Sequence, residues 1–475
     1  MTLIGIDFVF LLLSIFLTMI LTDRILSPER LLLGLKIVLP PQQVSTKETN
    51  KDKKEDKEKK RKTEFYLRFE KIRSGVPSGL YFYKDYDNLV SLGFITAVNY
   101  VFSLLFEQYT GRDSLWALLC QILLILISNV LSVGISPHLK DTTQGVVCFW
   151  FSVVSFLVSL IFMQQNNRLV IFNVDEAYQE FKTFVDVNIL DYYAWTTRMP
   201  SEPLLFKFVL AFLSGLLSYT CFTPIVNSIR CHWYFGSNIM MEQTKKTKKV
   251  IAQKYLSYLN LILPFMTACM FLRPIYDMFV SKSMYRASLL WLLFLTGTVR
   301  LLFVRPYFQS YMFSVLSKGL ESATIAKESI SSSAKVDFLQ KYLLKNFKFM
   351  MIVVIELLVI PFILITFSAI LNNKGHDYMF INHIAEFIPQ HLPFVDSLNS
   401  FLNHNLWSAL ERGSLQYFVQ EVVGFLSFWT CSAMTLMNIC CLIYNDTVDR
   451  WFRREESKRS AERRSRRQSI SSNNT

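Results

Sequence analysis

Residues 349–371 read FMMIVVIELLVIPFILITFSAIL, and Glu356 is the one charged residue in this stretch. Apolar runs of about 18 residues or more are typical of membrane-spanning helices, because roughly 20 residues at ~1.5 Å each cross the ~30 Å of hydrocarbon in a bilayer. Such a segment has to be a helix, since lipid offers the backbone no water to hydrogen-bond with. The stretch therefore predicts a helix that crosses a membrane.

Eight more stretches of the chain share this apolar character. They are residues 3–21, 89–106, 115–133, 145–163, 204–226, 256–272, 287–304 and 417–444. Hydrophobic residues make up 52% of the chain and charged residues 18%, against about 25% charged residues in soluble proteins. The sequence therefore predicts an all-α fold, a polytopic transmembrane helix bundle with nine spans. It argues against a soluble globular enzyme and against a disordered scaffold.

The positive residues between these stretches predict how the chain crosses the membrane. Lys and Arg gather in alternate connections, 39 on one side and 9 on the other, and cytosolic loops carry the excess of positive charge. We therefore expect the N-terminus outside or in a lumen and the C-terminus in the cytosol, in the plasma membrane or the endoplasmic reticulum. Residues 22–88 are then a cytosolic connection, 89–444 an eight-span bundle and 445–475 a cytosolic tail.

The first stretch, within residues 1–21, has two interpretations. A secretory signal begins with positive residues, but here the flanking Arg24 and Arg30 come after the apolar run. This order favours a retained first span. If the segment were instead a cleaved signal, eight spans would remain.

Three polar or amphipathic regions connect the spans. Residues 45–62 include a mixed-charge run with almost no apolar residue, and we expect this run to be disordered. Residues 337–350 carry apolar side chains at helical spacing, which predicts an interfacial helix that runs into the next span. Residues 169–193 have a weaker pattern of the same kind. It favours a helix that caps the bundle, with a groove for a partner helix as the alternative.

The basic tail and the last span contain candidate modification sites. The sequence RRSRR at 463–467 is typical of endoplasmic-reticulum retention signals, and RRQS places Ser469 in a pattern that basophilic kinases phosphorylate. A positive anchor without either role is the simpler interpretation. Cys440 and Cys441 end the last span and are candidates for palmitoylation, with apolar filling as the alternative.

Five charged residues fall within the predicted spans, where charge is costly and often functional. They are Asp7, Lys207, Arg300, Glu356 and Glu421. All but Glu356 lie within about two turns of a span end, and the long stems of Lys207 and Arg300 can reach the headgroups. Glu356 lies ~10 Å into its helix, so we expect it to be protonated or paired with Arg300 or Lys207. An ion or proton relay is the alternative.

Motifs for catalysis are not found in the sequence. It has no HExxH, CxxC or Gly-x-Ser-x-Gly pattern and no phosphate-binding glycine loop. His383, His391 and His404 share one connection with acidic residues, but a solvated loop explains them better than a metal site does. We therefore expect no enzyme activity, no cofactor and no metal.

Several short stretches resemble the transmembrane protein 161 family. The resemblance rests on residues 258–260 (YLN), 263–264 (LP), 272–275 (LRPI), 290–292 (LWL), 299–301 (VRL) and 320–330, and on Phe206, Lys207, Arg305, Gln309 and Tyr311. It implies a multi-pass protein without enzyme activity that is associated with control of potassium and calcium currents. It also implies that Arg300, Arg305 and Gln309 are polar anchors for a neighbouring helix or a partner, where an interhelical hydrogen bond contributes about 0.6–2 kcal/mol.

Two functional hypotheses follow. The first is a non-enzymatic protein that modulates ion currents by associating with membrane lipids, ion channels or other membrane proteins, without a nucleic-acid partner. The second is a secondary transporter or proton-coupled carrier that uses Glu356. Paired spans interrupted by Gly or Pro in two halves of the chain would favour the second, but no internal repeat is evident. The oligomeric state is not predicted.

Overall fold

The computed structural model describes most of the apolar part of the chain. It covers residues 6–24, 32–33, 35–39, 68–71, 80–105, 115–135, 142–164, 169–186, 200, 202–241, 248–325, 339–344, 346–347, 349–372 and 417–444. The charged run at 45–62, the tail at 445–475 with Ser469, and the connection with His383, His391 and His404 lie outside these residues.

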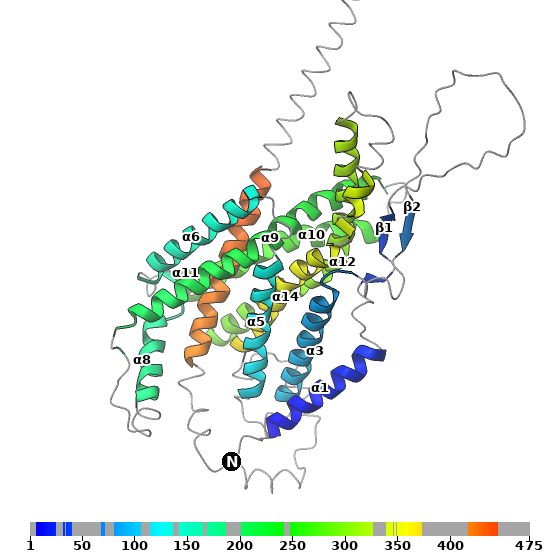
Figure 1. Cartoon of the computed structure of the whole chain (residues 1–475). Helices are drawn as coiled ribbons and strands as arrows, with labels where there is room; N and C mark the ends of the chain where they lie inside the picture. The colour runs from blue at the N-terminus through cyan, green and yellow to red at the C-terminus, as the bar shows by residue number, and fades with distance from the viewer. Residues whose placement is uncertain are drawn as a thin grey trace, which may run out of the picture.

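Helices dominate the described part of the chain (Figure 1). The long ones are α1 (Ile6–Arg24), α3 (Tyr83–Leu105), α5 (Leu115–Ile135), α6 (Thr142–Gln164), α9 (Leu204–Met241), α10 (Lys248–Met270), α12 (Lys282–Ile325), α14 (Met350–Leu371) and the C-terminal helix (Tyr417–Tyr444), drawn in orange. Seven are long and apolar enough to cross a membrane, and the shorter apolar segments Val9–Ile20 and Tyr255–Met270 lie in α1 and α10. All of them coincide with predicted stretches. The prediction of an all-α polytopic bundle is confirmed.

The central helix of the bundle is α14. It packs against α3, α5, α9 and α12. Within its 18-residue apolar segment, 89% of the residues are buried inside the protein. Its apolar side chains surround the whole helix instead of forming one stripe, which is typical of a buried helix. Glu356 therefore lies on the most buried of the seven helices that are long and apolar enough to cross a membrane.

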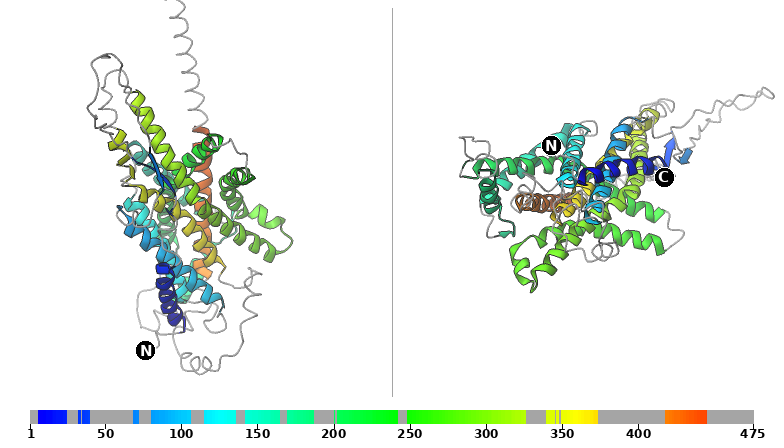
Figure 2. Two further views of the ribbon diagram at one scale, coloured as in Figure 1. Left: turned by 90° about the vertical axis from the view of Figure 1, so that its right-hand side faces the viewer. Right: turned by 90° about the horizontal axis from the view of Figure 1, so that it is seen from below.

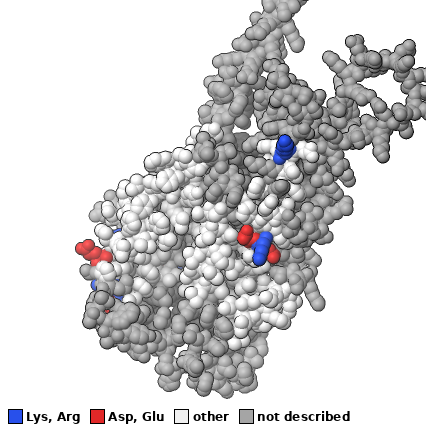
Figure 3. All heavy atoms as spheres, in the orientation of Figure 1, with Lys and Arg blue, Asp and Glu red and all other residues white. Residues whose placement is uncertain are grey.

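The outer helices expose large apolar side chains. In the 18-residue apolar segment of α6, 22% of the residues are buried, and Phe149, Trp150 and Ile161 are exposed. α1 lies at another edge, alongside α3 and α5 (Figure 2). On the face drawn in Figure 3, most of the described surface is neither acidic nor basic. A surface of this kind is typical of helices that contact lipid.

The helices α9 and α12 extend beyond the spans predicted within them. They have 38 and 44 residues, and the distal part of α12 packs through Val315 and Leu316 against Leu339 and Leu343. The latter two residues belong to the apolar face of the amphipathic stretch at 337–350. This part of the apolar face therefore packs on the distal part of α12.

Two short elements gather at one end of the bundle, and a strand pair lies elsewhere. α8 (Val174–Val185) falls within the predicted capping stretch and buries Val174, Ala177 and Tyr178, and α11 (Arg273–Met278) follows α10. The strands β1 (Lys36–Leu39) and β2 (Arg68–Lys71) pair antiparallel, with Lys36 opposite Lys71. This pair flanks the charged run and was not predicted from the sequence.

Candidate functional site

Glu356 lies inside the bundle and is hydrogen-bonded across helices. Its side chain has no exposed surface, and its Oε2 atom accepts a hydrogen bond of 2.8 Å from Asn227 Nδ2 on α9. A buried carboxyl needs such partners, because transfer out of water without compensation is costly. The expected burial of this carboxyl is found, and its hydrogen-bond donor is an amide that the sequence analysis did not single out.

Arg300 is also buried, although we had expected its stem to reach the headgroups. Its side chain is 6% exposed. Its Nε and Nη2 atoms have no hydrogen-bond partner within the described part of the chain. A buried guanidinium in this state carries a large desolvation cost, so it attracts any acceptor that can reach it, such as a water molecule or a carboxylate.

The two charged residues line one small cavity. The cavity has a volume of about 10 Å³. Its lining comes from four helices: Pro224 and Ser228 of α9, Asn260 of α10, Arg300 and Tyr307 of α12, and Glu356, Leu357 and Ile360 of α14. A cavity near ~10–15 Å³ is at the lower limit for one water molecule. The site therefore joins four helices around a space that fits a water or a proton but no larger solute.

The close approach of α12 and α14 explains why Arg300 meets this cavity. Ser368 Oγ donates to the carbonyl of Leu290 at 3.2 Å. Farther along, a Cβ atom on Gly297 would lie 2.7 Å from Ile365 Cγ1 and 3.2 Å from the carbonyl of Pro361. The two helices thus run in opposite directions with a small residue at their crossing. Arg300 follows Gly297 by one turn and so lies near Glu356.

A chain of polar side chains leads from the cavity toward the far part of α9. Asn260 Nδ2 donates to Tyr307 OH at 3.0 Å, and Tyr307 OH lies 3.3 Å from Ser257 Oγ. Ser257 Oγ in turn lies 2.5 Å from His232 Nδ1. His232 lies beyond Ile229, where the apolar span of α9 ends. Burial lowers the pKa of its imidazole, because desolvation disfavours the charged form.

Most of this cluster could not be recognised from the sequence. The predicted stretch 204–226 ends before His232, whereas α9 continues to Met241 and includes this residue. The sequence signal for this cluster is the presence of polar residues in or next to apolar runs, namely Asn227, Asn260 and Tyr307. Buried polar groups in helix bundles usually find partners on neighbouring helices, but the sequence does not say which partner each one has.

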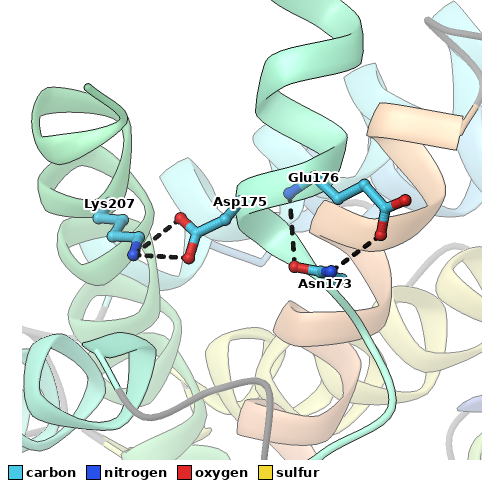
Figure 4. A network of polar contacts seen from close by, with 4 residues as sticks. All are labelled: Asn173, Asp175, Glu176 and Lys207. Carbon is cyan, nitrogen blue, oxygen red and sulfur yellow. Dashed lines mark hydrogen bonds and ion pairs between the residues drawn. The ribbon is translucent and has the colours of Figure 1, made fainter. Parts of the chain in front are cut away.

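Two more of the expected intramembrane charges, Lys207 and Glu421, lie at the end of the bundle near α8; Figure 4 shows the contact of Lys207. Lys207 Nζ lies 2.7 Å from Asp175 Oδ1, with the two side chains 18% and 38% exposed. Glu421 Oε2 accepts a hydrogen bond of 2.8 Å from the backbone N–H of Asn173. A carboxylate is stabilised there by the N-terminal end of the α8 dipole. Lys207 is therefore paired with a residue other than Glu356.

The first turn of α8 is closed by its own capping contacts. Asn173 Oδ1 accepts from the backbone N–H of Glu176 at 3.4 Å, and Asn173 Nδ2 donates to Glu176 Oε2 at 2.8 Å (Figure 4). A side-chain oxygen at this position satisfies a helix N–H that has no partner within the helix. The capped helix thus presents Asp175 to Lys207 and the Asn173 N–H to Glu421.

The remaining candidate residues lie apart from the polar cluster. Arg305 is exposed, and its Nη2 donates to the carbonyl of Leu33 at 2.8 Å; Gln309 lies one turn later on α12 and is partly buried. Cys440 is exposed and Cys441 partly buried in the C-terminal helix. Asp7 lies in α1, but its side chain is outside the described part.

The described side chains do not form a metal site. Within the described residues, no three His, Cys, Asp or Glu side chains lie close enough together to hold a metal ion. The buried cluster around Glu356 combines one carboxyl with amide, hydroxyl and guanidinium donors, which suits a proton or a water better than a metal cation.

Comparison with protein families identifies the chain. A family model described as predicted transmembrane protein 161AB matches residues 30–448. Neither the curated proteins nor the solved structures gave a match. The matched region includes every helix that lines the cavity around Glu356.

Proposed function

Since the chain belongs to the predicted transmembrane protein 161AB family, we propose that it is a non-enzymatic, multi-pass membrane protein that modulates potassium and calcium currents. In this proposal it acts by associating with ion channels, other membrane proteins or the lipids around them. It does not conduct or transport a solute itself. The resemblance of its sequence to this family first suggested the role.

The observation that carries the proposal is the small size of the central cavity. The space beside Glu356 measures about 10 Å³, whereas pockets for small molecules usually have about 300–1,000 Å³. A solute path through the bundle would require the helices around α14 to separate. The buried cluster is better suited to holding four helices in one arrangement.

The outer surfaces of the bundle offer room for association. On α10, Tyr255, Tyr258, Ile262, Phe265 and Met266 are exposed. They recur at helical spacing on a helix that packs against α9, α11 and α12. Large apolar and aromatic side chains that face outward contact lipid or a partner helix in a membrane. A rigid interior with an apolar exterior fits a regulator that works through its surface.

Current recordings test this proposal directly. Whole-cell potassium and calcium currents would be compared in excitable cells that lack the protein and in the same cells after its return. We expect current density or gating to be altered in the cells that lack the protein and to be restored when the protein is returned. Tyr258→Ala together with Phe265→Ala, on the exposed face of α10, should weaken the effect, with Phe149→Ala on exposed α6 as the matched control.

Two results would contradict the proposal. One is that currents are the same with and without the protein at matched channel expression. The other is that purified protein in liposomes moves a solute by itself. Affinity purification from mild detergent would identify the partner, and loss of that partner with the α10 variant would link the two measurements.

A proton-coupled carrier is the second candidate, and one specific observation favours it. The polar chain from His232 through Ser257 and Tyr307 ends at the cavity that Glu356 lines. Such a chain could move a proton to a buried carboxyl. Glu356→Gln should abolish pH-driven uptake in liposomes under this hypothesis. Glu202→Gln, at an exposed carboxylate, is the matched control.

A further inference from the structure

A second cavity lies at the end of the bundle that carries α8 and α11. It has a volume of about 300 Å³, which is within the range of sites for small ligands, about 300–1,000 Å³. Its walls come from five segments: residues 171–172, the region from Phe271 to Tyr276, the first turns of α12, Leu371 at the end of α14, and the start of the C-terminal helix. We call it the bundle-end cavity.

The lining of the bundle-end cavity is divided between apolar and polar side chains. Its apolar side chains, which we call the apolar wall, include Phe172, Phe271, Leu289, Leu290 and Leu371. Its polar side chains are Tyr276, Lys282, Tyr285, Arg286, Tyr417, Gln420 and Glu421. A cavity lined by both apolar and polar side chains matches an amphiphile better than a purely polar metabolite. Tyrosines are also frequent at the depth of lipid headgroups.

The two cations of the cavity belong to the first turns of α12. Lys282 is the first residue of this helix, and its Nζ lies 5.8 Å from the centre of the Tyr276 ring. Arg286 follows four residues later, on the same face of the helix, and its Nη2 lies 3.5 Å from the carbonyl of Leu371. Both cations lie at the positive end of the dipole of α12, where an anion is stabilised.

A buried amide gives an independent sign of a ligand. Gln420 lines the cavity and is 7% exposed, and its Nε2 atom has no hydrogen-bond partner in the described part of the chain. A buried donor without an acceptor costs about 1–3 kcal/mol. An oxygen of a ligand in the cavity would supply the missing acceptor.

The charges favour an anion over a cation. Two cations face one carboxylate, Glu421, and its Oε2 already accepts the N–H of Asn173.

The surface next to Lys282 indicates a membrane source for the ligand. Met278 and Met284 are 79% and 68% exposed and Val280 is fully exposed, which suits residues immersed in lipid beside the headgroup layer.

We propose that the bundle-end cavity binds the anionic headgroup of a phospholipid. The phosphate lies against Lys282 and Arg286 and accepts a hydrogen bond from Gln420. The first part of an acyl chain lies on the apolar wall formed by Phe172, Leu289 and Leu371. Phosphate oxygens are strong acceptors for guanidinium and ammonium groups. A soluble phosphate has no apolar part that could contact the apolar wall, whereas a phospholipid has one.

Binding is measured on the full chain in nanodiscs. Purified, delipidated protein is placed in phosphatidylcholine, and dioleoyl phosphatidic acid is added as the probe; retained lipid is detected by native mass spectrometry and by thermal unfolding. We expect phosphatidic acid to bind and to raise the unfolding temperature, with no equal effect from added phosphatidylcholine. Arg286→Gln should weaken binding by about tenfold, the loss of one charge-assisted contact.

Matched variants separate the site from general attraction to the membrane. Arg273→Gln removes an exposed cation near this end of the bundle that does not line the cavity, and binding should persist. Gly424→Leu fills part of the cavity and should block binding. Gly424→Ala should fold and bind, because its Cβ would lie 3.7 Å from Phe172 Cδ1 and 3.9 Å from Leu371 Cδ2, which is ordinary contact.

Three outcomes would overturn the proposal. The first is equal binding of phosphatidic acid and phosphatidylcholine. The second is unchanged binding in both Arg286→Gln and Gly424→Leu. The third is that inorganic phosphate or glycerol phosphate displaces the lipid at equal concentration, because the ligand would then be a soluble phosphate and the apolar wall would have no part in binding.

Discussion

Asn227 of α9 donates a hydrogen bond of 2.8 Å to Glu356 of α14, and this contact joins two residues separated by 129 positions in the chain. Glu356 has no exposed surface. The contact therefore connects the central helix to its neighbour at the point where a carboxyl most needs a donor. Predictions about the stability of the bundle start from this pair.

Replacing Asn227 by Ala should destabilise the bundle by about 1–3 kcal/mol, because it leaves a buried carboxyl without this donor. Unfolding in a mixed-detergent titration would measure the loss. In a Glu356→Leu background the same replacement should cost less, since the acceptor is already gone. Equal costs in the two backgrounds would show that the hydrogen bond contributes nothing.

Replacing Gly297 by Ala should destabilise the crossing of α12 and α14. The new Cβ would lie 2.7 Å from Ile365 Cγ1 and 3.2 Å from the carbonyl of Pro361, so the helices would have to separate. Overpacking of this kind costs about 1–3 kcal/mol. The thermal midpoint in detergent measures it.

The control for this variant is Gly145→Ala in α6. A Cβ at Gly145 would have no neighbour within 4 Å, and Ala is about 1 kcal/mol better than Gly inside a helix. This control should be neutral or slightly stabilising. If both variants had the same midpoint, the close crossing of α12 and α14 would be wrong.

Breaking the Lys207–Asp175 pair should have a small effect. The two side chains are 18% and 38% exposed, so water screens their attraction, and pairs of this kind contribute about 0.2–1 kcal/mol. We expect Lys207→Met to lower stability by less than about 1 kcal/mol and the loss to shrink at high salt. A large loss that salt does not change would mean that the pair is shielded from water in the membrane.

The stability of the protein should decrease in mild acid through His232. Burial lowers the pKa of this imidazole below its ordinary value of 6.5. The unfolded chain therefore takes up a proton at a higher pH than the folded one. Linkage then makes stability fall as pH drops through the unfolded pKa of about 6.5 and toward the lowered folded value.

The test compares the wild type with His232→Gln between pH 7.5 and 5. Gln keeps a hydrogen-bonding group near Ser257 but does not titrate, so the variant should lose part of the acid sensitivity. An unchanged slope of stability against pH would contradict the role of His232. Gln variants of His383, His391 and His404, which lie outside the described part of the chain, serve as controls.

The positions of the helices could be predicted well, but the polar cluster could not. Every predicted apolar stretch lies wholly or largely within a helix, because hydropathy depends on short windows of sequence. The burial of Arg300 could not be predicted in this way. Its place near a span end suggested contact with headgroups, whereas α12 continues to Ile325 and places it inside the bundle.

Lys207 and Glu421 show a different limit. Their depth near the span ends was a fair expectation, and both lie at the end of the bundle near α8. The partners Asp175 and Asn173 could not be inferred, because they come from a capping helix whose position depends on tertiary contacts. Pairs between polar residues far apart in sequence require knowledge of which helices are neighbours.

The amino-acid sequence alone determined that this chain is a helical membrane protein, because length and apolarity of continuous segments decide whether a helix can cross lipid. The tertiary structure alone decided that α14 lies at the centre and that Arg300 and Glu356 line one cavity. The spans differ in hydropathy, but hydropathy averaged over a segment does not distinguish a face that meets lipid from one that meets protein. Small residues such as Gly297 and the shapes of the facing side chains make that distinction.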